Sequence, residues 1–226
     1  MGELIIFLLT KLLERHTNTF GVRDFKPSPN DTWTDNFNEV LHSLQTFVEA
    51  GKIRAIGISN EKAWGTMRFA EEVRNHNITP ISTTQNAYSM LNRVFEGDLA
   101  EVSMRENIGL LAYSPLAFGV LSGKYIEGTA ADNARLKLFP RFARYSSEQS
   151  TEATKQYLNL AKDLGISLTT LALAFVNQRP FVTSNIIGAT NLDQLKENID
   201  SVDIILDQEV LEEINAIHHE NPNPAP

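Results

Sequence analysis

Two patterns of apolar residues alternate along most of this chain. Residues 36–50 show helical spacing most clearly, because five apolar residues fall on one face and Gly51 follows them. The short apolar run at 53–58 comes next and predicts a β-strand. Further helices are predicted at 63–76, 97–107, 150–164, 168–178, 192–201 and 208–218, and further strands at 81–85, 109–114 and 184–188. Strands that alternate with helices are typical of β/α units with a parallel sheet.

The number of predicted strands bears on the architecture. The pattern predicts four β/α units, or five if the first residues contribute a strand. A closed barrel of such units has eight strands and usually needs about 250 residues, whereas this chain has 226. We therefore expect an α/β fold that forms part of a (β/α)8 TIM barrel, with an unclosed sheet.

The segment 186–198 has the layout of a phosphate site. An apolar strand is predicted to run through Gly188 into a polar helix start, where free backbone N–H groups and the positive end of the helix dipole favour an anion. Thr190 or Asn191 would cap this helix, with Asp193 or Gln194 as the partner in its first turn. From these residues alone, a phosphate site and a well-capped helix behind a buried strand fit equally well.

Three other predicted strands end in polar or aromatic side chains. One ends at Ser59 and Asn60, a second at Gln85, and a third at Tyr113 and Ser114. In an α/β barrel the ligand lies across the carboxyl ends of the parallel strands. The four strand ends therefore predict one shared site.

Composition excludes several classes of function. The net charge is −8 with both signs interleaved, so there is no basic patch to neutralise phosphates and we expect no nucleic-acid partner. The absence of cysteine excludes disulfides, thiolate metal sites and cysteine nucleophiles, and no metal site is predicted. No linker or repeat divides the chain, which favours one domain, with the proline-rich segment 221–226 as a frayed tail.

Five motifs resemble those of the aldo-keto reductase family, in the family's order and spacing. They are GKIRAIGISN, TTQNAYSMLNR, LLAYSPLAFGVLSGKY, ALAFVNQRPFV and NIIGATNLDQLKENI. The resemblance runs from about Thr17 to Pro226 and is closest to a bacterial Tas-like subgroup. It implies the carboxyl-terminal part of the family's barrel, with residues 1–16 as a divergent N-terminal segment and residues 17–226 as a partial NADP-dependent oxidoreductase domain.

The resemblance implies a parent reaction, the NADPH-dependent reduction of a small-molecule aldehyde or ketone to an alcohol. The family catalyses it with an Asp, a proton-donating Tyr, a Lys and a His, and the first three come from the first half of the barrel, which has no counterpart here. The His would fall within residues 11–13, which are Lys-Leu-Leu, and His16 lies beyond that strand end in a predicted loop. None of the tyrosines matches the family's acid. No catalytic residue is assigned, and the chain alone is predicted to be inactive.

Two alternatives to a broken reductase stay open. The sequence could be an incomplete gene model of a working enzyme. It could also be a nucleotide-sensing or interaction protein that binds NADP without catalysis. Half a barrel leaves an open strand edge and an apolar face, so self-association of the chain alone through the open barrel edges is expected.

The first residues do not resemble the family. Ile5, Leu8, Leu9, Leu12 and Leu13 recur with helical spacing, and the apolar run is far shorter than the ~20 residues of a membrane span. Without a signal peptide or myristoylation motif, we expect no membrane span and a cytoplasmic location. The segment fits a degenerate strand, a short amphipathic helix, or sequence created by a changed reading frame or an alternative start. The abrupt loss of resemblance favours this last origin.

Cofactor contacts are implied where the local motifs match the family. Ser59, Asn60 and Gln85 match residues that hydrogen-bond the nicotinamide carboxamide, and Tyr113 matches the ring that stacks on the nicotinamide. Pyrophosphate contacts fall on Ser114, Leu116, Gly119 and Lys124, and adenosine contacts on Gly188, Thr190, Gln194, Glu197 and Asn198. Simpler roles compete with these: Ser59 and Asn60 as helix caps, Tyr113 as a core residue and Lys124 as a solvated side chain.

The choice between NADP(H) and NAD depends on two departures from the family. Many members place Lys and Arg where this chain has Gly188 and Gln194, and those cations bind the 2′-phosphate of NADP. Arg135 aligns approximately with a loop arginine that assists in related branches. NADP(H) is therefore the predicted cofactor.

Overall fold

The computed structural model describes residues 6–9, 35–139 and 144–226. The described chain forms two compact units. The first runs up to Asn86 and also takes in Glu96–Leu111, and the second combines Ala87–Phe95 with Ala112–Pro226.

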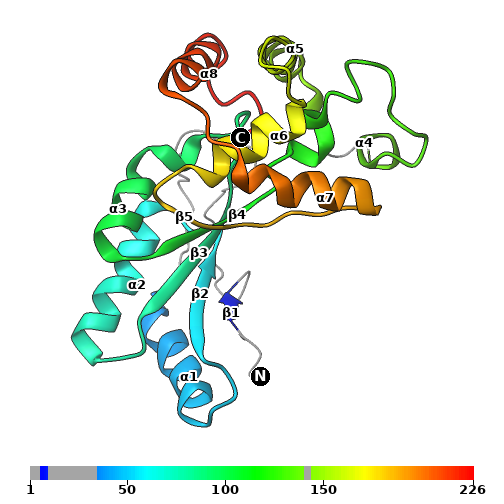
Figure 1. The fold of residues 1–226 in the computed structure, drawn as a ribbon. Helices are drawn as coiled ribbons and strands as arrows, with labels where there is room; N and C mark the ends of the chain where they lie inside the picture. Colours follow the sequence, from blue (N-terminus) through cyan, green and yellow to red (C-terminus); the bar gives the residue numbers. More distant parts are fainter. Residues whose placement is uncertain (1–5, 10–34, 140–143) are drawn as a thin grey trace, which may run out of the picture. The chain divides into compact units, whose positions relative to one another are not determined.

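The first unit is built from parallel strands with helices between them. Its elements are β1 (Ile6–Leu9), α1 (Phe37–Glu49), β2 (Ala55–Ser59), α2 (Ala63–His76), β3 (Ile81–Ala87), α3 (Asp98–Glu106) and the start of β4 (Gly109–Tyr113). β1 pairs in parallel with β2, and β2 with β3, with a register shift at Ile56/Gly57. Figure 1 shows α1, α2 and α3 on the same side of β2 and β3.

The core of this unit lies between the helices and the strands. Phe37 and Leu41 of α1 and Ile56 of β2 are fully buried, and they pack with Phe69 of α2. The rings of Phe37 and Phe69 meet edge to face at 4.8 Å. These are apolar positions that the helical and strand patterns placed on one face, so the sequence period and the packing agree.

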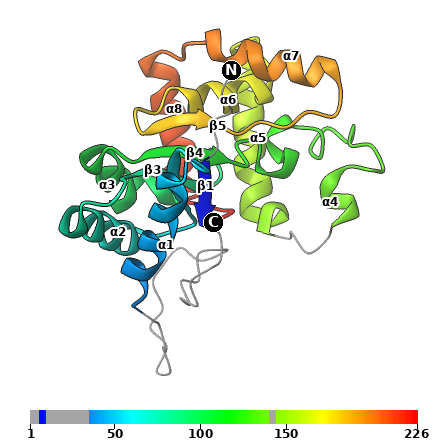
Figure 2. The same cartoon turned by 90° about the horizontal axis from the view of Figure 1, so that it is seen from below.

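The second unit is mainly helical. The last residues of β4 belong to it. They are followed by the 3₁₀ segment η2 (Ala117–Ser122), α4 (Arg135–Leu138), α5 (Glu148–Asp163), α6 (Leu168–Asn177), β5 (Val182–Asn185), α7 (Leu192–Asp200), the 3₁₀ turn η4 (Ser201–Asp203) and α8 (Gln208–Glu220). The short 3₁₀ segment η1 (Val94–Glu96) spans a point in the sequence where one unit ends and the other resumes. α6 packs against α5, α7 and β5 (Figure 2). Its residues 171–176 are fully buried, because this helix is apolar on all sides.

The alternation of parallel strands and helices is that of part of a (β/α)8 barrel, as the sequence predicted. The predicted helices are confirmed, and 63–76 matches α2 to the residue. The first residues contribute β1, so the degenerate-strand alternative holds for Ile6–Leu9. The boundaries of the divergent segment and of the partial domain stay predictions.

Two predictions about local structure are wrong. The last strand ends at Asn185 and not at 188, because β4, its hydrogen-bonding neighbour, stops at Tyr113 and offers Ile186 only the carbonyl of Ala112, at 2.8 Å. The end of the chain is not frayed either. Ala225 is fully buried, and its N–H donates to the carbonyl of Leu91 at 3.0 Å.

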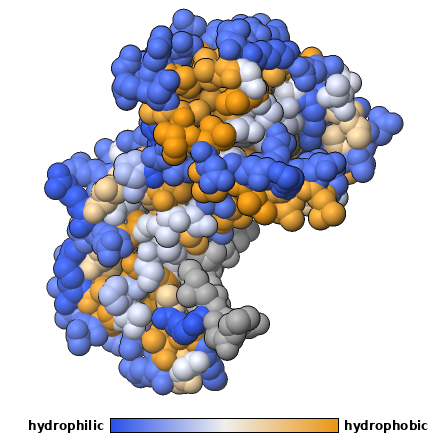
Figure 3. All heavy atoms as spheres, in the orientation of Figure 1, coloured by the Kyte–Doolittle hydropathy of each residue, from blue (hydrophilic) through white to orange (hydrophobic). Residues whose placement is uncertain are grey.

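An apolar stripe lies exposed along α7 and the turn after it. Leu192, Leu195, Ile199, Val202 and Ile205 are 81%, 40%, 56%, 62% and 76% exposed. Figure 3 shows hydrophobic residues gathered in this region. The spacing of the first four residues places them on one helical face, which we call the α7 stripe together with Ile205.

No single helix in the described residues is long and apolar enough to cross a membrane. Taken together, α5 and α6 have the length and the apolar composition of a membrane span, but the two helices are bent by 96° at the break between them.

Candidate functional site

The carboxyl ends of β2 and β3 bring three predicted cofactor residues together. The backbone N–H of Asn60 and the hydroxyl of Ser59 both donate to the carbonyl of Gln85, at 2.9 and 3.1 Å. The Asn60 side-chain amide donates to the Ser59 hydroxyl at 3.2 Å. All three residues are half-buried; Ser59 ends β2, and Gln85 pairs with it in β3, which continues to Ala87 and not only to the predicted 85. The arrangement holds a hydroxyl and two amides, which supply both donors and acceptors.

The competing role of Ser59 and Asn60 as helix caps is wrong. α2 begins after Lys62, and no side-chain hydrogen bond caps its first turn. Asn60 instead takes the left-handed backbone conformation, with φ of 56°, which turns the chain away from the strand. Asparagine adopts this conformation more readily than most residues, so the chain can turn here without a glycine.

The loop after β4 contains the predicted pyrophosphate residues and is unusually strained. Ser114, Ala117, Phe118 and Gly119 all have positive φ, at 56°, 47°, 58° and 86°. Non-glycine residues in this conformation cost of order 1–3 kcal/mol each and persist where the surroundings hold them. The loop is held by backbone bonds from Ala117 N–H to Ser114 and from Gly119 N–H to Leu116, at 2.8 and 2.7 Å.

Gly119 and Lys124 are in close approach within this loop. A Cβ atom added at Gly119 would lie 2.8 Å from the Lys124 amine. The amine therefore lies against the glycine backbone, and the φ of Gly119, 86°, is a conformation that residues with a side chain rarely adopt. The structure thus brings a cation to the strained loop, as a pyrophosphate contact requires.

Tyr113 ends β4 and is half-buried, so it is not one of the fully buried core residues. Burial raises the pKa of its hydroxyl from 10.0 to about 12, although the nearby Arg144 guanidinium opposes this increase. The phenol is therefore neutral over the whole physiological range. A neutral ring of this kind suits stacking on a nicotinamide more than it suits acid catalysis near neutral pH.

The pKa of Tyr113 predicts a loss of stability in alkali. Above pH 10.0 an unfolded chain releases the Tyr113 proton, while the folded chain keeps it until about pH 12. The folded state then binds more protons, so the free energy of unfolding should fall across this interval. Denaturant unfolding at about pH 9 and about pH 11.5 should show a smaller fall for Tyr113→Phe than for the unchanged chain. Tyr125→Phe is the control, and equal falls in all three proteins would contradict the prediction.

The segment between β5 and α7 brings together most of the predicted adenosine residues. Asn191 caps α7 by accepting a bond from the Gln194 N–H at 2.9 Å. The Gln194 side-chain oxygen in turn accepts from the N–H and hydroxyl of Thr190, at 2.9 and 3.0 Å. Asn198 is 5% exposed and donates to the carbonyl of Gly188 at 3.2 Å. The predicted capping pair is therefore Asn191 with Gln194.

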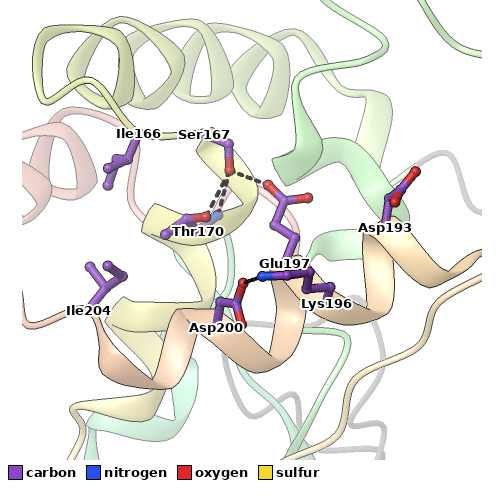
Figure 4. Close-up of a pocket in the computed structure, with 8 residues that line it drawn as sticks. All are labelled: Ile166, Ser167, Thr170, Asp193, Lys196, Glu197, Asp200 and Ile204. Carbon is purple, nitrogen blue, oxygen red and sulfur yellow. Dashed lines mark hydrogen bonds and ion pairs between the residues drawn. The ribbon is translucent and has the colours of Figure 1, made fainter.

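Glu197 lies on a different face of α7 from Asn198. It accepts a hydrogen bond from Ser167 at the start of α6, and it lines a cavity of about 410 Å³ between the two helices (Figure 4). Asp193 and Asp200 also line this cavity, and Lys196 pairs with Asp200. Three carboxylates against one cation disfavour an anionic ligand. The cavity is therefore not a nucleotide phosphate site.

Arg135 begins α4, and its guanidinium lies over the ring of Phe118 at 4.8 Å. Phe118 belongs to the strained loop, so Arg135 contacts the predicted pyrophosphate segment. Nothing in the sequence pattern singled out Arg144, which contacts both Tyr113 and Tyr145. Its only sequence signal is its place in a segment that resembles the family.

The histidine and tyrosine positions that were considered for catalysis contribute little to the described site. Residues 11–13 and His16 lie outside the described residues. Tyr88, Tyr145 and Tyr157 are buried, and the Tyr157 hydroxyl donates to the carbonyl of Met90 at 3.3 Å. Within the described ranges, no group of three or more His, Asp or Glu side chains could hold a metal ion.

Comparison with known proteins gives a consistent set of relatives. A model of the aldo/keto reductase family matches residues 16–219. Protein Tas of Escherichia coli K12 is 46% identical over 218 residues, 94% of this chain and 61% of Tas. An aldo-keto reductase of Babesia bovis is 39% identical over 187 residues, 79% of this chain and 65% of the relative. L-glyceraldehyde 3-phosphate reductase of Escherichia coli K12 is 30% identical over 169 residues, 73% of this chain and 49% of the relative. The chain spans less than two thirds of the length of these relatives.

Proposed function

We propose that this chain, which belongs to the aldo/keto reductase family and fits its Tas-like subgroup, binds NADP(H) in the cytoplasm. Family membership supports an oxidoreductase function. The parent reaction would transfer a hydride from NADPH to an aldehyde or ketone carbon while an acid protonates the oxygen. Ser59, Asn60, Gln85 and Tyr113 would hold the nicotinamide, and the loop after β4 the pyrophosphate.

The clustering of Ser59, Asn60 and Gln85 supports this proposal most directly. The three residues lie near the carboxyl ends of two neighbouring parallel strands, and the serine and asparagine do not cap α2. Half-buried polar side chains at strand ends without a structural cap to form are typical of a ligand site in a parallel α/β fold. A carboxamide offers the complementary donors and acceptors.

NADP(H) is proposed over NAD on the basis of two residues. Gln194 is exposed in the first turn of α7, at the positive end of the helix dipole, which favours an anion. Arg135 would assist the 2′-phosphate from its own segment. Neither residue would bind the 2′-phosphate as strongly as a lysine and an arginine together, so only a modest preference for NADP(H) over NAD is expected.

Nucleotide titration tests the proposed site. Tyr113→Ala should weaken NADPH binding by about twofold to tenfold, because a stacked ring contributes ~0.5–1.5 kcal/mol beyond its buried area. Gln194→Ala and Asn198→Ala should each weaken it by about fivefold, as expected for one hydrogen bond. Fluorescence titration of NADPH measures all three.

An adenosine fragment separates the two ends of the site. Gln194→Ala and Asn198→Ala should weaken binding of 2′,5′-ADP as well, whereas Tyr113→Ala should leave it unchanged. Asn159→Ala removes an exposed amide of α5 and serves as the matched control. Equal NADPH affinity in the unchanged chain and the three site variants would show that these residues do not form the site.

A second candidate is an interaction protein that binds NADP without catalysis and associates with a second copy of itself. The α7 stripe favours it, because large apolar side chains in one continuous row are rarely left exposed on a monomer. β1 also stands at one end of the strand order, where backbone groups on its outer edge can pair with another strand.

A further inference from the structure

The segment Asn223–Pro226, here called the docked tail, is tied to residues far from it in the sequence. The N–H of Arg93 donates to the Asn223 side-chain oxygen at 2.6 Å, and the N–H of Ala225 donates to Leu91 at 3.0 Å. The hydroxyl of Ser150, itself fully buried, donates to the carbonyl of Pro224 at 3.0 Å. A segment rich in proline is held here by several directed bonds.

Arg144 joins the docked tail to the strained loop. One guanidinium nitrogen donates to the main-chain oxygen of Pro226 at 3.0 Å, and the other donates to the hydroxyl of Tyr145 at 2.6 Å. The Tyr145 ring stacks on Phe118, with centroids 4.8 Å apart. Phe118 precedes Gly119 and has a positive φ. These contacts therefore link the docked tail to Phe118, the neighbour in sequence of Gly119, which lies against the Lys124 amine.

Arg144 also acts on Tyr113. Its charge and a hydrogen bond from its side chain lower the pKa of the Tyr113 hydroxyl against the larger effect of burial. One planar, permanently charged side chain with several N–H donors can serve the tail, Tyr145 and Tyr113 together, whereas a lysine offers only a single ammonium group.

We propose that Arg144 is a positioning residue, which uses the docked tail as a fixed support to hold Tyr113 and the Phe118–Gly119 loop in the geometry that binds the nicotinamide end of the cofactor. The inference rests on the proposed NADP(H) site and adds the element that orders it. Strain in the loop makes such support necessary, because residues with unfavourable φ keep their conformation only when neighbours hold them. A preorganised site binds more tightly because less order is lost on binding.

Three variants test the support. Arg144→Ala and a chain that ends at Asn223 should each weaken NADPH binding by about tenfold and leave 2′,5′-ADP binding unchanged. Arg144→Lys should recover part of the loss, because it restores the charge without the planar fork. Arg179→Ala is the matched control: Arg179 also lies over a ring, that of Phe175 at 4.3 Å, but it does not join the tail to the loop.

A second measurement needs no cofactor. Absorbance at alkaline pH follows tyrosine ionisation, and Arg144→Ala should move the Tyr113 transition to higher pH, because the opposing cation is lost. Tyr113→Phe identifies that transition by removing it. Arg144→Ala and Arg179→Ala should both keep the far-ultraviolet circular dichroism of the unchanged chain, and the chain that ends at Asn223 provides a second variant if Arg144→Ala does not fold.

The outcomes separate the two proposals. If the unchanged chain binds NADPH and the tail and Arg144 variants bind it equally well, the positioning role is overturned and the proposed function stands. An equal loss of 2′,5′-ADP affinity would also overturn it, because the effect would then be general unfolding. If the unchanged chain binds neither nucleotide, the proposed function fails, and an unmoved Tyr113 transition in Arg144→Ala would then overturn the coupling as well.

Discussion

A polypeptide of these 226 residues should leave NADPH unoxidised in the presence of aldehydes, ketones or quinones. Carbonyl reduction needs an acid of tuned pKa within hydrogen-bond reach of the substrate oxygen, and general acid catalysis alone contributes ~10²–10⁴ in rate. The resemblance to the family assigns no such acid to this chain. Tyr113 cannot replace it, because burial raises its pKa to about 12 and so disfavours proton transfer near neutral pH.

The measurement is the absorbance of NADPH at increasing protein concentration, with the same polypeptide shown to bind NADPH in a parallel titration. That control separates a missing reaction from a missing cofactor. A rate that rises with protein concentration and disappears in Tyr113→Phe or Tyr125→Phe would overturn the prediction. Such a result would assign the acid to a residue of this chain.

The regular elements were predictable because each carries a local pattern. α2 is correct to the residue, since its apolar positions repeat with helical spacing and Asn77, in the left-handed conformation, ends it. The last strand was predicted to end three residues too late, at 188 and not at Asn185, because Ile186 and Ile187 look like a buried strand. In the structure both are more than a third exposed, at 38% and 37%. The length of a strand depends on its hydrogen-bonding neighbour, and β4 turns away at Ser114, so the strand ends before these two residues.

The docked tail could not be predicted from its own residues. Proline removes backbone donors, so a segment such as 221–226 has few groups with which to form regular structure. Its partners, Leu91, Arg93 and Ser150, are distant in the sequence and are brought to it only by the packing of the second unit. Contacts of this kind depend on the complete fold, and no local period reports them.

The candidate site was predictable in the parts that lie at strand ends. Ser59, Asn60 and Gln85 meet because parallel strands share one carboxyl edge. The part of the site on α7 was less predictable, because adjacent residues on a helix face different directions and the motif does not show which of them face the site. Asn198 faces Gly188, whereas Glu197 turns to Ser167. Arg144 was missed because its role depends on two long-range contacts rather than on a motif.

The isolated chain should self-associate through the α7 stripe, and a charged substitution there should release the monomer. Leu192 and Ile199 are 81% and 56% exposed, and burial of a large apolar side chain contributes ~1.5–3 kcal/mol. Replacing both by glutamate should therefore weaken association by at least about 100-fold. Size-exclusion chromatography with light scattering, at several micromolar concentrations, measures the change.

Met104→Glu is the matched control for this experiment, because Met104 is 55% exposed on α3, belongs to the first unit and is not part of the α7 stripe. It should leave the size of the particle unchanged. An exposed apolar face of this extent also predicts a broad thermal transition for the chain when dilute, since whole domains are stable by only ~5–15 kcal/mol. A monodisperse monomer with a sharp, cooperative transition in the unchanged chain would show that the stripe needs no second copy, and that the expected open edges do not weaken the fold.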